Sequence, residues 1–183
     1  MTDVRASLRT EFCALLLALA AFGLPGCHRV DPPADPALAS ATRFVEGFYA
    51  WYVPAAQNGW GLQVATLDSA RLFAPALLAA LRADGEAQAA NPDEVVGLDG
   101  DPFLDAQDFC EEYHAGAAHR KGGAILVDVH GTCTHHADGQ ADVIAEVGGR
   151  DGALAFVNFR YPGRGSDLIK DLDLLRRERE TKR

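Results

Sequence analysis

The sequence lacks the motifs by which proteins usually bind nucleotides or nucleic acids. It contains neither a Walker-type phosphate-binding loop nor the GxGxxG pattern, whose glycines let backbone amides approach phosphate groups. Basic residues are few as well, since 17 Lys and Arg stand against 26 Asp and Glu and give a net charge of −9. Affinity for nucleic acids comes largely from cationic side chains that neutralise phosphates, so this balance argues against a nucleic-acid partner.

Spacings typical of metal sites are also missing. No CxxC, HxH or HExxH pattern occurs, although zinc favours the imidazole and thiolate groups found near Cys133. The histidines in that part of the chain are His114, His119, His130, His135 and His136. Their spacing fits no zinc motif, so we expect exposed histidines, no bound metal and no cofactor.

The apolar run near the N-terminus is too short to cross a membrane as a helix. Residues 12–24 are uncharged, but a spanning helix needs roughly 20 such residues. Preceded by Arg5 and Arg9, the run matches the apolar region of a signal peptide. It ends in Leu24-Pro25-Gly26-Cys27, which resembles the lipobox of bacterial lipoproteins, although Pro25 stands where a small residue is commoner. The resemblance implies cleavage before Cys27 and lipid on its thiol.

The chain therefore divides into residues 1–26 as a signal peptide, 27–37 as a tether and 38–183 as a single domain. Three prolines in the second segment favour an extended tether. Lipid on Cys27 would hold the domain on the periplasmic face of a bacterial membrane. By analogy with enteric lipoproteins, where an Asp after the cysteine signals retention in the inner membrane, His28 favours the outer membrane. An ordinary secretory signal and a retained anchor stay open as alternatives.

Hydrophobic periodicity predicts helices first and strands afterwards. Apolar residues recur every three or four positions from Leu38 to Tyr52, before Pro54 ends the first helix. A second helical stretch covers residues 68–90, with Pro75 in the first turn of its main helix. From Tyr113 the period changes to two, and short glycine-bearing turns separate strands near residues 125–129, 143–147 and 155–161. A last helix begins near Ser166 as N-cap.

This order predicts an α+β fold, in which N-terminal helices pack on a curved antiparallel sheet of about four strands and a C-terminal helix follows. Within the predicted last strand, Asn158 and Arg160 share one face and Tyr161 lies on the other. The two polar side chains could orient a ligand in an apolar pocket or lie on a solvated face. Both readings stay open.

The acidic segment from Asp93 to Glu112 is the second candidate site. Its oxygen ligands would suit calcium, but the order of residues lacks the EF-hand spacing. We expect Asp101 to cap a short helix that starts at Pro102, with Phe103 and Leu104 in the core. Candidate ligand or partner contacts in this segment are Asp101, Asp105 and Asp108.

Three segments of the chain resemble the YbjP/YqhG family of bacterial exported proteins and lipoproteins. They are Phe48-Tyr49-Ala50-Trp51-Tyr52, the acidic stretch from Asn91 to Asp108, and Asn158-Phe159-Arg160-Tyr161 with the leucine-bearing helix after it. The resemblance implies a cystatin-like or nuclear-transport-factor-like cone. It implies no reaction, because the activity of that family is not established.

The cysteine count predicts one disulfide. Once Cys27 is lipidated and the signal peptide removed, Cys110 and Cys133 remain, and an even pair in an oxidising compartment favours a bridge. Glu111 and Glu112 disfavour a reactive thiolate at Cys110. If residues 121–123 form a hairpin turn, the two cysteines lie at nearly symmetric positions on its two arms.

These observations predict a lipid-anchored binding or interaction module without enzymatic activity, whose partners are the membrane and an envelope protein. One alternative is an immunity protein that blocks a secreted toxin with its acidic loop. The other is a small hydrolase or isomerase with a catalytic pocket, for which Asp105, Asp108 and His114 are the candidate titratable groups.

Lipid attachment is directly testable on the chain purified from bacterial membranes. We expect mass spectrometry to find Cys27 as the first residue and to find it diacylated, because the apolar run ends at a lipobox-like sequence. Replacing Cys27 with Ser should give an unprocessed or soluble form. Cleavage elsewhere, or an unmodified Cys27, would contradict the assignment.

Overall fold

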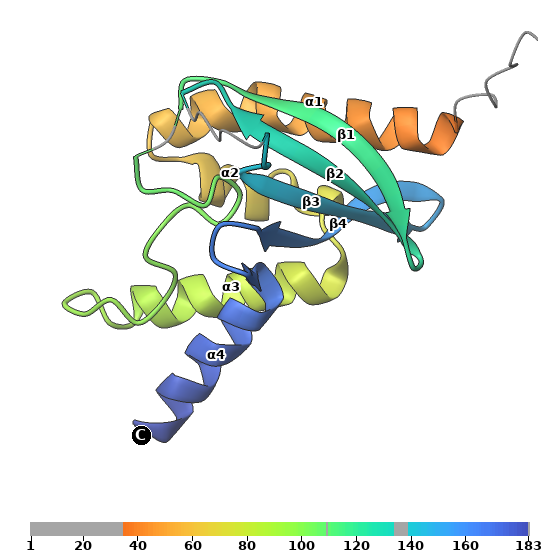
Figure 1. Cartoon of the computed structure of the whole chain (residues 1–183). Helices are drawn as coiled ribbons and strands as arrows, with labels where there is room; N and C mark the ends of the chain where they lie inside the picture. Colours follow the sequence, from red (N-terminus) through yellow and green to blue (C-terminus); the bar gives the residue numbers. More distant parts are fainter. Residues whose placement is uncertain (1–34, 109, 134–138, 183) are drawn as a thin grey trace, which may run out of the picture. The chain divides into compact units, whose positions relative to one another are not determined.

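The computed structural model describes residues 35–108, 110–133 and 139–182. Cys27, the predicted tether up to residue 34, and His135 and His136 lie outside the described residues. The elements in chain order are α1 (Pro36–Gln57), α2 (Gly61–Thr66), the short 3-10 helix η1 (Ala70–Leu72), α3 (Pro75–Ala89), β1 (Tyr113–Lys121), β2 (Ala124–Gly131), β3 (Val143–Arg150), β4 (Ala153–Tyr161), β5 (Ser166–Asp167) and α4 (Leu168–Thr181). Figure 1 shows α1 lying along the sheet.

The strands form one antiparallel sheet whose spatial order, β1-β2-β3-β4-β5, is also the order along the chain. The predicted α+β class is therefore confirmed. The sheet has five strands instead of about four, because Ser166 and Asp167 pair with Tyr161 and Arg160 before the last helix begins. A sequence pattern cannot reveal a strand of two residues.

Helix α1 begins two residues before the predicted Leu38 and ends later, so Pro36 and Ala37, predicted as the end of the tether, belong to the helix. The side chain of Asp35 accepts a hydrogen bond from the N–H of Ala37 at 2.9 Å, and Pro36 occupies the first helical position. The predicted stop at Pro54 is wrong, since the helix continues to Gln57. Pro54 has no N–H for the carbonyl of Ala50, but both residues are exposed, so water can bind that carbonyl.

A cluster of aromatic rings fills the space between α1 and the sheet. Phe48 lies at its centre, with ring centroids 4.9 Å from Tyr52, 5.5 Å from Phe103 and 4.8 Å from Phe156. Phe48 is almost fully buried, and burial of a side chain of this size contributes about 1.5–3 kcal/mol. The core thus joins the first helix, the acidic segment and the fourth strand.

Strand β4 departs from strict alternation. Its register with β3 shifts between the pairs Glu146–Asn158 and Val147–Phe156, which is a β-bulge. Phe156 therefore faces the core together with Phe159 and Tyr161, although alternation predicts Phe156 on the opposite face. Asn158 and Arg160 share one face, as predicted.

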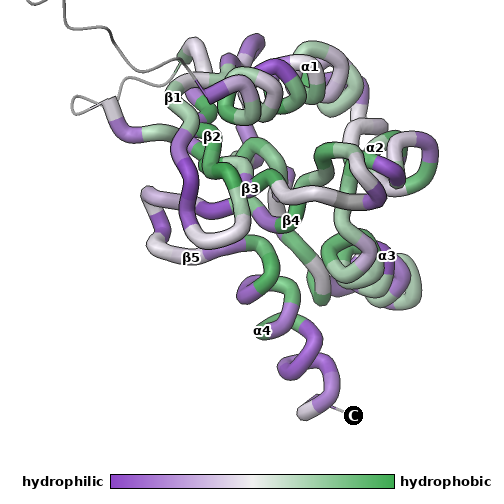
Figure 2. The backbone as a smooth tube through the Cα atoms, turned by 90° about the vertical axis from the view of Figure 1, so that its right-hand side faces the viewer, coloured by the Kyte–Doolittle hydropathy of each residue, from purple (hydrophilic) through white to green (hydrophobic). Residues whose placement is uncertain are grey.

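Helix α4 is capped by Asp167 and not by the predicted Ser166. The Asp167 side chain accepts a hydrogen bond from the N–H of Lys170, while Ser166 belongs to β5. Leu168 and Leu172 bury the first half of α4 against the core. Figure 2 shows the change along this helix from an apolar start to a hydrophilic C-terminal half. The distal half of α4 thus offers little apolar surface to the core.

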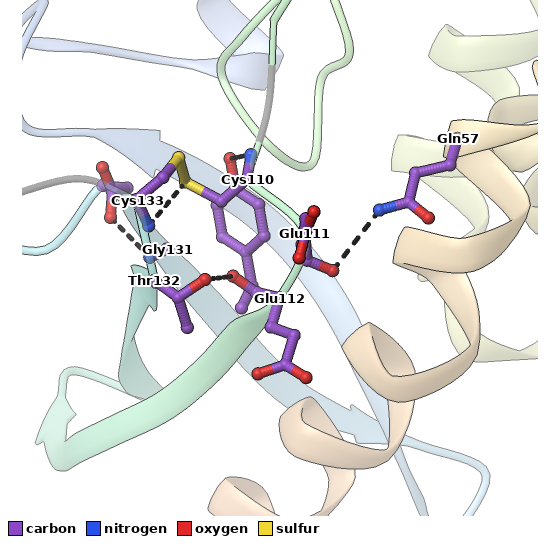
Figure 3. The surroundings of a disulfide bond; sticks show 9 residues. Gln57, Cys110, Glu111, Glu112, Gly131, Thr132 and Cys133 are labelled. Carbon is purple, nitrogen blue, oxygen red and sulfur yellow. Dashed lines mark hydrogen bonds between the residues drawn. A yellow bond between two sulfur atoms is a disulfide. The ribbon is translucent and has the colours of Figure 1, made fainter.

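The first hairpin carries the predicted disulfide. Strands β1 and β2 are joined at Gly122 and Gly123, and Cys110 bonds to Cys133 with a Cα–Cα separation of 5.2 Å. Figure 3 shows the bridge beside the end of β2, where the N–H of Cys133 also donates to Cys110 Sγ at 3.2 Å. Gly131 is needed there, because a Cβ would come within 2.6 Å of that sulfur.

Loss of the bridge should destabilise the domain. Replacing Cys133 with Ser should cost about 2–5 kcal/mol, since the crosslink restricts the unfolded chain. Denaturant unfolding should show this decrease in the free energy of unfolding. The Cys110→Ser, Cys133→Ser double variant should show no larger decrease. Peptide mapping of the unreduced chain that recovers both thiols free would contradict the bridge.

Candidate functional site

The acidic segment is a long loop between α3 and β1. Asp101 Oδ1 accepts hydrogen bonds from the N–H groups of Phe103 at 2.9 Å and Leu104 at 3.2 Å. Asp101 therefore caps a turn, and the predicted helix at Pro102 does not form. The reason lies at Asp105, whose φ of 51° is left-handed and incompatible with a continuing helix. Phe103 and Leu104 are buried, as predicted.

Three tyrosine hydroxyls fix this loop to the core. Tyr52 donates to Asp101 Oδ2 at 2.6 Å, Tyr49 to the carbonyl of Phe103 at 2.7 Å, and Tyr161 to the carbonyl of Pro102 at 2.8 Å. Burial raises the pKa of Asp101, although the hydrogen bonds from Tyr52 and the backbone act to lower it. Burial and the nearby Asp101 carboxylate raise the pKa of Tyr52, so this hydroxyl remains a donor.

Arg164 fastens the loop to α4. Its Nε lies 2.8 Å from Asp105 Oδ1 and its Nη2 lies 3.1 Å from Asp171 Oδ2, while the guanidinium stacks 4.3 Å from the centroid of the Tyr161 ring. A cation held over an aromatic face and between two carboxylates gains from each contact. Sequence reasoning missed Arg164, because the turn that carries it pairs with residues far away along the chain.

An open groove of about 490 Å³ lies between the acidic loop and α4. Charged and apolar side chains from both elements line it: Leu98, Asp99, Asp101, Pro102, Asp105, Tyr161, Arg164, Asp171, Leu174 and Leu175. Four carboxylates and one guanidinium make the lining acidic. Leu174 is 57% exposed, so an apolar side chain stands uncovered at the groove.

A nearly buried ion pair supports one wall of the groove. Asp84 in α3 accepts from the N–H of Leu98 at 2.9 Å and from Arg179 Nη1 at 2.7 Å, and the same nitrogen of Arg179 lies 2.7 Å from the carbonyl of Val96. Gly97 is required beside it, since a Cβ would approach Asp84 Oδ2 to 2.8 Å. The wall is thus held by groups that the sequence pattern did not indicate.

Asn158 and Arg160 do not line the groove. The Asn158 side chain donates to Asp167 Oδ1 at 3.0 Å and accepts from the N–H of Ile169 at 3.2 Å, so it secures the start of α4. Arg160 pairs with Glu146 across the sheet at 2.6 Å. The structure separates these two candidates from the acidic ones.

The three candidate catalytic groups do not meet in one pocket. Asp105 and Asp108 line a smaller cavity of about 210 Å³ beside the disulfide. His114 lies on the exposed surface, 3.1 Å from Glu46 and 3.5 Å from Glu112, and its hydrogen bond with Glu46 raises its pKa. Asp108 is exposed, and Asp105 is already paired with Arg164.

In the described part of the chain, no group of three or more His, Cys, Asp or Glu side chains is placed to hold a metal ion. Across residues 35–108, 110–133 and 139–182, no helix has the length and apolar character to cross a bilayer.

No protein-family model, no curated protein and no solved structure matches this chain. The resemblance to the YbjP/YqhG family therefore stays a prediction.

The buried carboxylate gives a pH-dependent prediction. Burial raises the pKa of Asp101 in the folded state, so protonation of this carboxyl stabilises the folded protein. This stabilisation is complete below the pKa of the unfolded chain, and it is lost as the pH rises through the pKa of the folded state. Wild-type stability should therefore increase relative to Asp101→Asn as the pH falls from 7 toward about 4. Denaturant unfolding of both proteins across that range measures the difference.

The Tyr52→Phe variant provides the matched comparison. The substitution removes the hydroxyl that donates to the ionised Asp101 carboxylate. It should therefore lower the free energy of unfolding by about 1–3 kcal/mol at pH 7 and by less at low pH. Equal pH dependence in wild type and Asp101→Asn would contradict a raised pKa at Asp101.

Proposed function

We propose that the chain is an exported binding module without catalytic activity, whose groove between the acidic loop and α4 receives a basic and partly apolar segment of an envelope protein. The single observation that carries the proposal is the acidic groove with Leu174 exposed at it. Such a combination of open apolar surface and convergent polar groups is typical of recognition sites.

Charge complementarity selects the kind of partner. The groove carries more carboxylates than cations, and the chain as a whole has a net charge of −9. An acidic field attracts Lys and Arg side chains and repels acidic ones, which favours partner choice and association rate. A peptide with alternating basic and apolar residues would satisfy both parts of the lining.

Binding accounts for the groove better than catalysis does. Its half-buried carboxylates already have partners, since Asp101 accepts from Tyr52 while Asp105 and Asp171 bind Arg164. A general acid or base needs freedom to exchange a proton with a substrate. These groups instead keep the walls in place for a partner to contact.

We further propose that lipid on Cys27 anchors this module on the periplasmic face of a bacterial membrane. The disulfide between Cys110 and Cys133 supports export, because disulfides persist in oxidising compartments and are rare in the cytosol. The lipobox-like sequence supports the lipid, and His28 favours the outer membrane.

The exposed acids of the loop favour one alternative. Asp93, Glu94, Asp99 and Asp108 face solvent, so an immunity protein could present them to the basic active site of a secreted toxin. Protection of toxin-expressing cells that depends on Asp93 and Glu94, but not on Leu174, would favour immunity over the groove.

A labelled peptide tests the groove in the full chain. A fluorescein-labelled octapeptide of alternating Lys and Leu should bind, as measured by anisotropy, and binding should weaken with salt because exposed charges are screened. Replacing Leu174 with Arg should weaken binding about ten-fold, since this removes an apolar contact and adds a positive charge that repels the basic peptide.

Leu67→Arg is the matched control. Leu67 is 56% exposed, nearly the same as Leu174, and its substitution changes the net charge equally, but it does not line the groove. The control should bind like wild type. Equal weakening by both variants, or equal binding of a Glu-Leu peptide, would contradict a specific groove.

A further inference from the structure

A third hollow, of about 500 Å³, lies between α1 and the segment around η1. Its lining differs from that of the acidic groove and shares no residue with it: Arg43, Phe44, Gly47, Phe48, Trp51, Ser69, Arg71 and Leu72. Three aromatic residues and two arginines thus meet here in a protein that is acidic overall.

The aromatic side of this hollow is held in place by the core. Phe44 packs on Phe156 with ring centroids 4.7 Å apart, and Trp51 packs on Phe48 at 5.2 Å in an edge-to-face arrangement. Phe48 itself is nearly buried. Rings fixed from behind offer a flat apolar surface at little further cost in conformational entropy.

The two arginines stand apart from the others described. Six arginines with described side chains bind a carboxylate: Arg120, Arg160, Arg164, Arg176, Arg177 and Arg179. Arg82 donates to the carbonyl of Thr66. Arg43 donates to Ser40 Oγ at 3.1 Å; among the described residues neither it nor Arg71 has an acidic partner. Two guanidinium groups therefore keep their capacity to bind an anion.

Gly47 keeps this hollow open. A Cβ at this position would meet nothing within 4 Å, so packing does not require glycine there. Glycine inside a helix costs roughly 0.5–1 kcal/mol relative to alanine. A larger side chain would project from α1 into the space between Arg43 and Trp51, which are one turn away on either side.

We propose that this hollow binds a small organic anion with a flat apolar body, of which an aromatic carboxylate is the simplest case. The body packs on Phe44 and Trp51, and the anionic group lies between Arg43 and Arg71. A bidentate guanidinium contact suits a carboxylate in particular. This site is independent of the acidic groove, which would attract the opposite charge.

The test uses the full chain in nonionic detergent and the probe 2-naphthoate, followed by isothermal titration against a matched detergent blank. The anion should bind at least ten-fold more tightly than its neutral analogue 2-naphthalenemethanol, because only the anion engages the arginines. Replacing Arg43 and Arg71 together with Gln should remove this preference.

A substitution that fills the hollow distinguishes binding at this site from a general electrostatic attraction of anions to the protein. Gly47→Leu should abolish binding while the thermal stability of the protein is kept or raised. Gly85→Leu is the matched control, since Gly85 lies in α3 with similar open space and outside the hollow, and it should bind like wild type. Equal affinity for the neutral analogue, absence of binding to both probes, or binding that survives Gly47→Leu would overturn the proposal.

Discussion

The attachment of the acidic loop to the core by tyrosine hydroxyls is the constraint on which the rest of the molecule depends. The described residues of the loop between α3 and β1 form no helix or named strand, yet the loop inserts Phe103 and Leu104 into the core. Buried backbone carbonyls need donors, and Tyr49 and Tyr161 supply them to Phe103 and Pro102. Without these contacts the loop could not serve as a wall of the groove or as part of the aromatic cluster.

Asp101 shows how one carboxylate serves both the loop and α1. Its two oxygens bind backbone N–H groups of the turn and the Tyr52 hydroxyl. The remaining acids of the segment separate into Asp105, which pairs with Arg164, and residues that face solvent. A single acidic stretch thus contains structural and surface charges, and only position in the fold distinguishes them.

The sequence predicted the parts of the fold that depend on local pattern. The change of period at Tyr113, the glycines at the hairpin turns and the even cysteine pair were enough to predict the antiparallel sheet and the bridge between Cys110 and Cys133. The predictions at two helix ends were wrong. Helix α1 continues past Pro54 because the carbonyl left without a donor is exposed to water, and Ser166 does not cap α4 because it pairs in the short strand β5. The bulge in β4 could not be predicted from the alternation either, since it depends on the packing that places Phe156 on the core face of the sheet.

The groove could be predicted only in part. Asp101 and Asp105 line it as candidates, but Arg164, Asp171 and the pair Asp84–Arg179 come from segments far apart in the chain. Nothing in their local spacing indicates that they meet. Arg43 and Arg71 were missed for the same reason, because the hollow exists only once η1 lies beside α1.

The order of the strands has a consequence for how the chain folds. Each strand pairs with the next one along the sequence, so the sheet can grow by successive hairpins with small loop-closure entropy, and contacts of this local kind favour rapid folding. The cysteines flank the first of these hairpins. The crosslink can therefore form as soon as β1 and β2 pair, before β3, β4 and α4 are in place, and would then hold the first hairpin together while the later strands add to it.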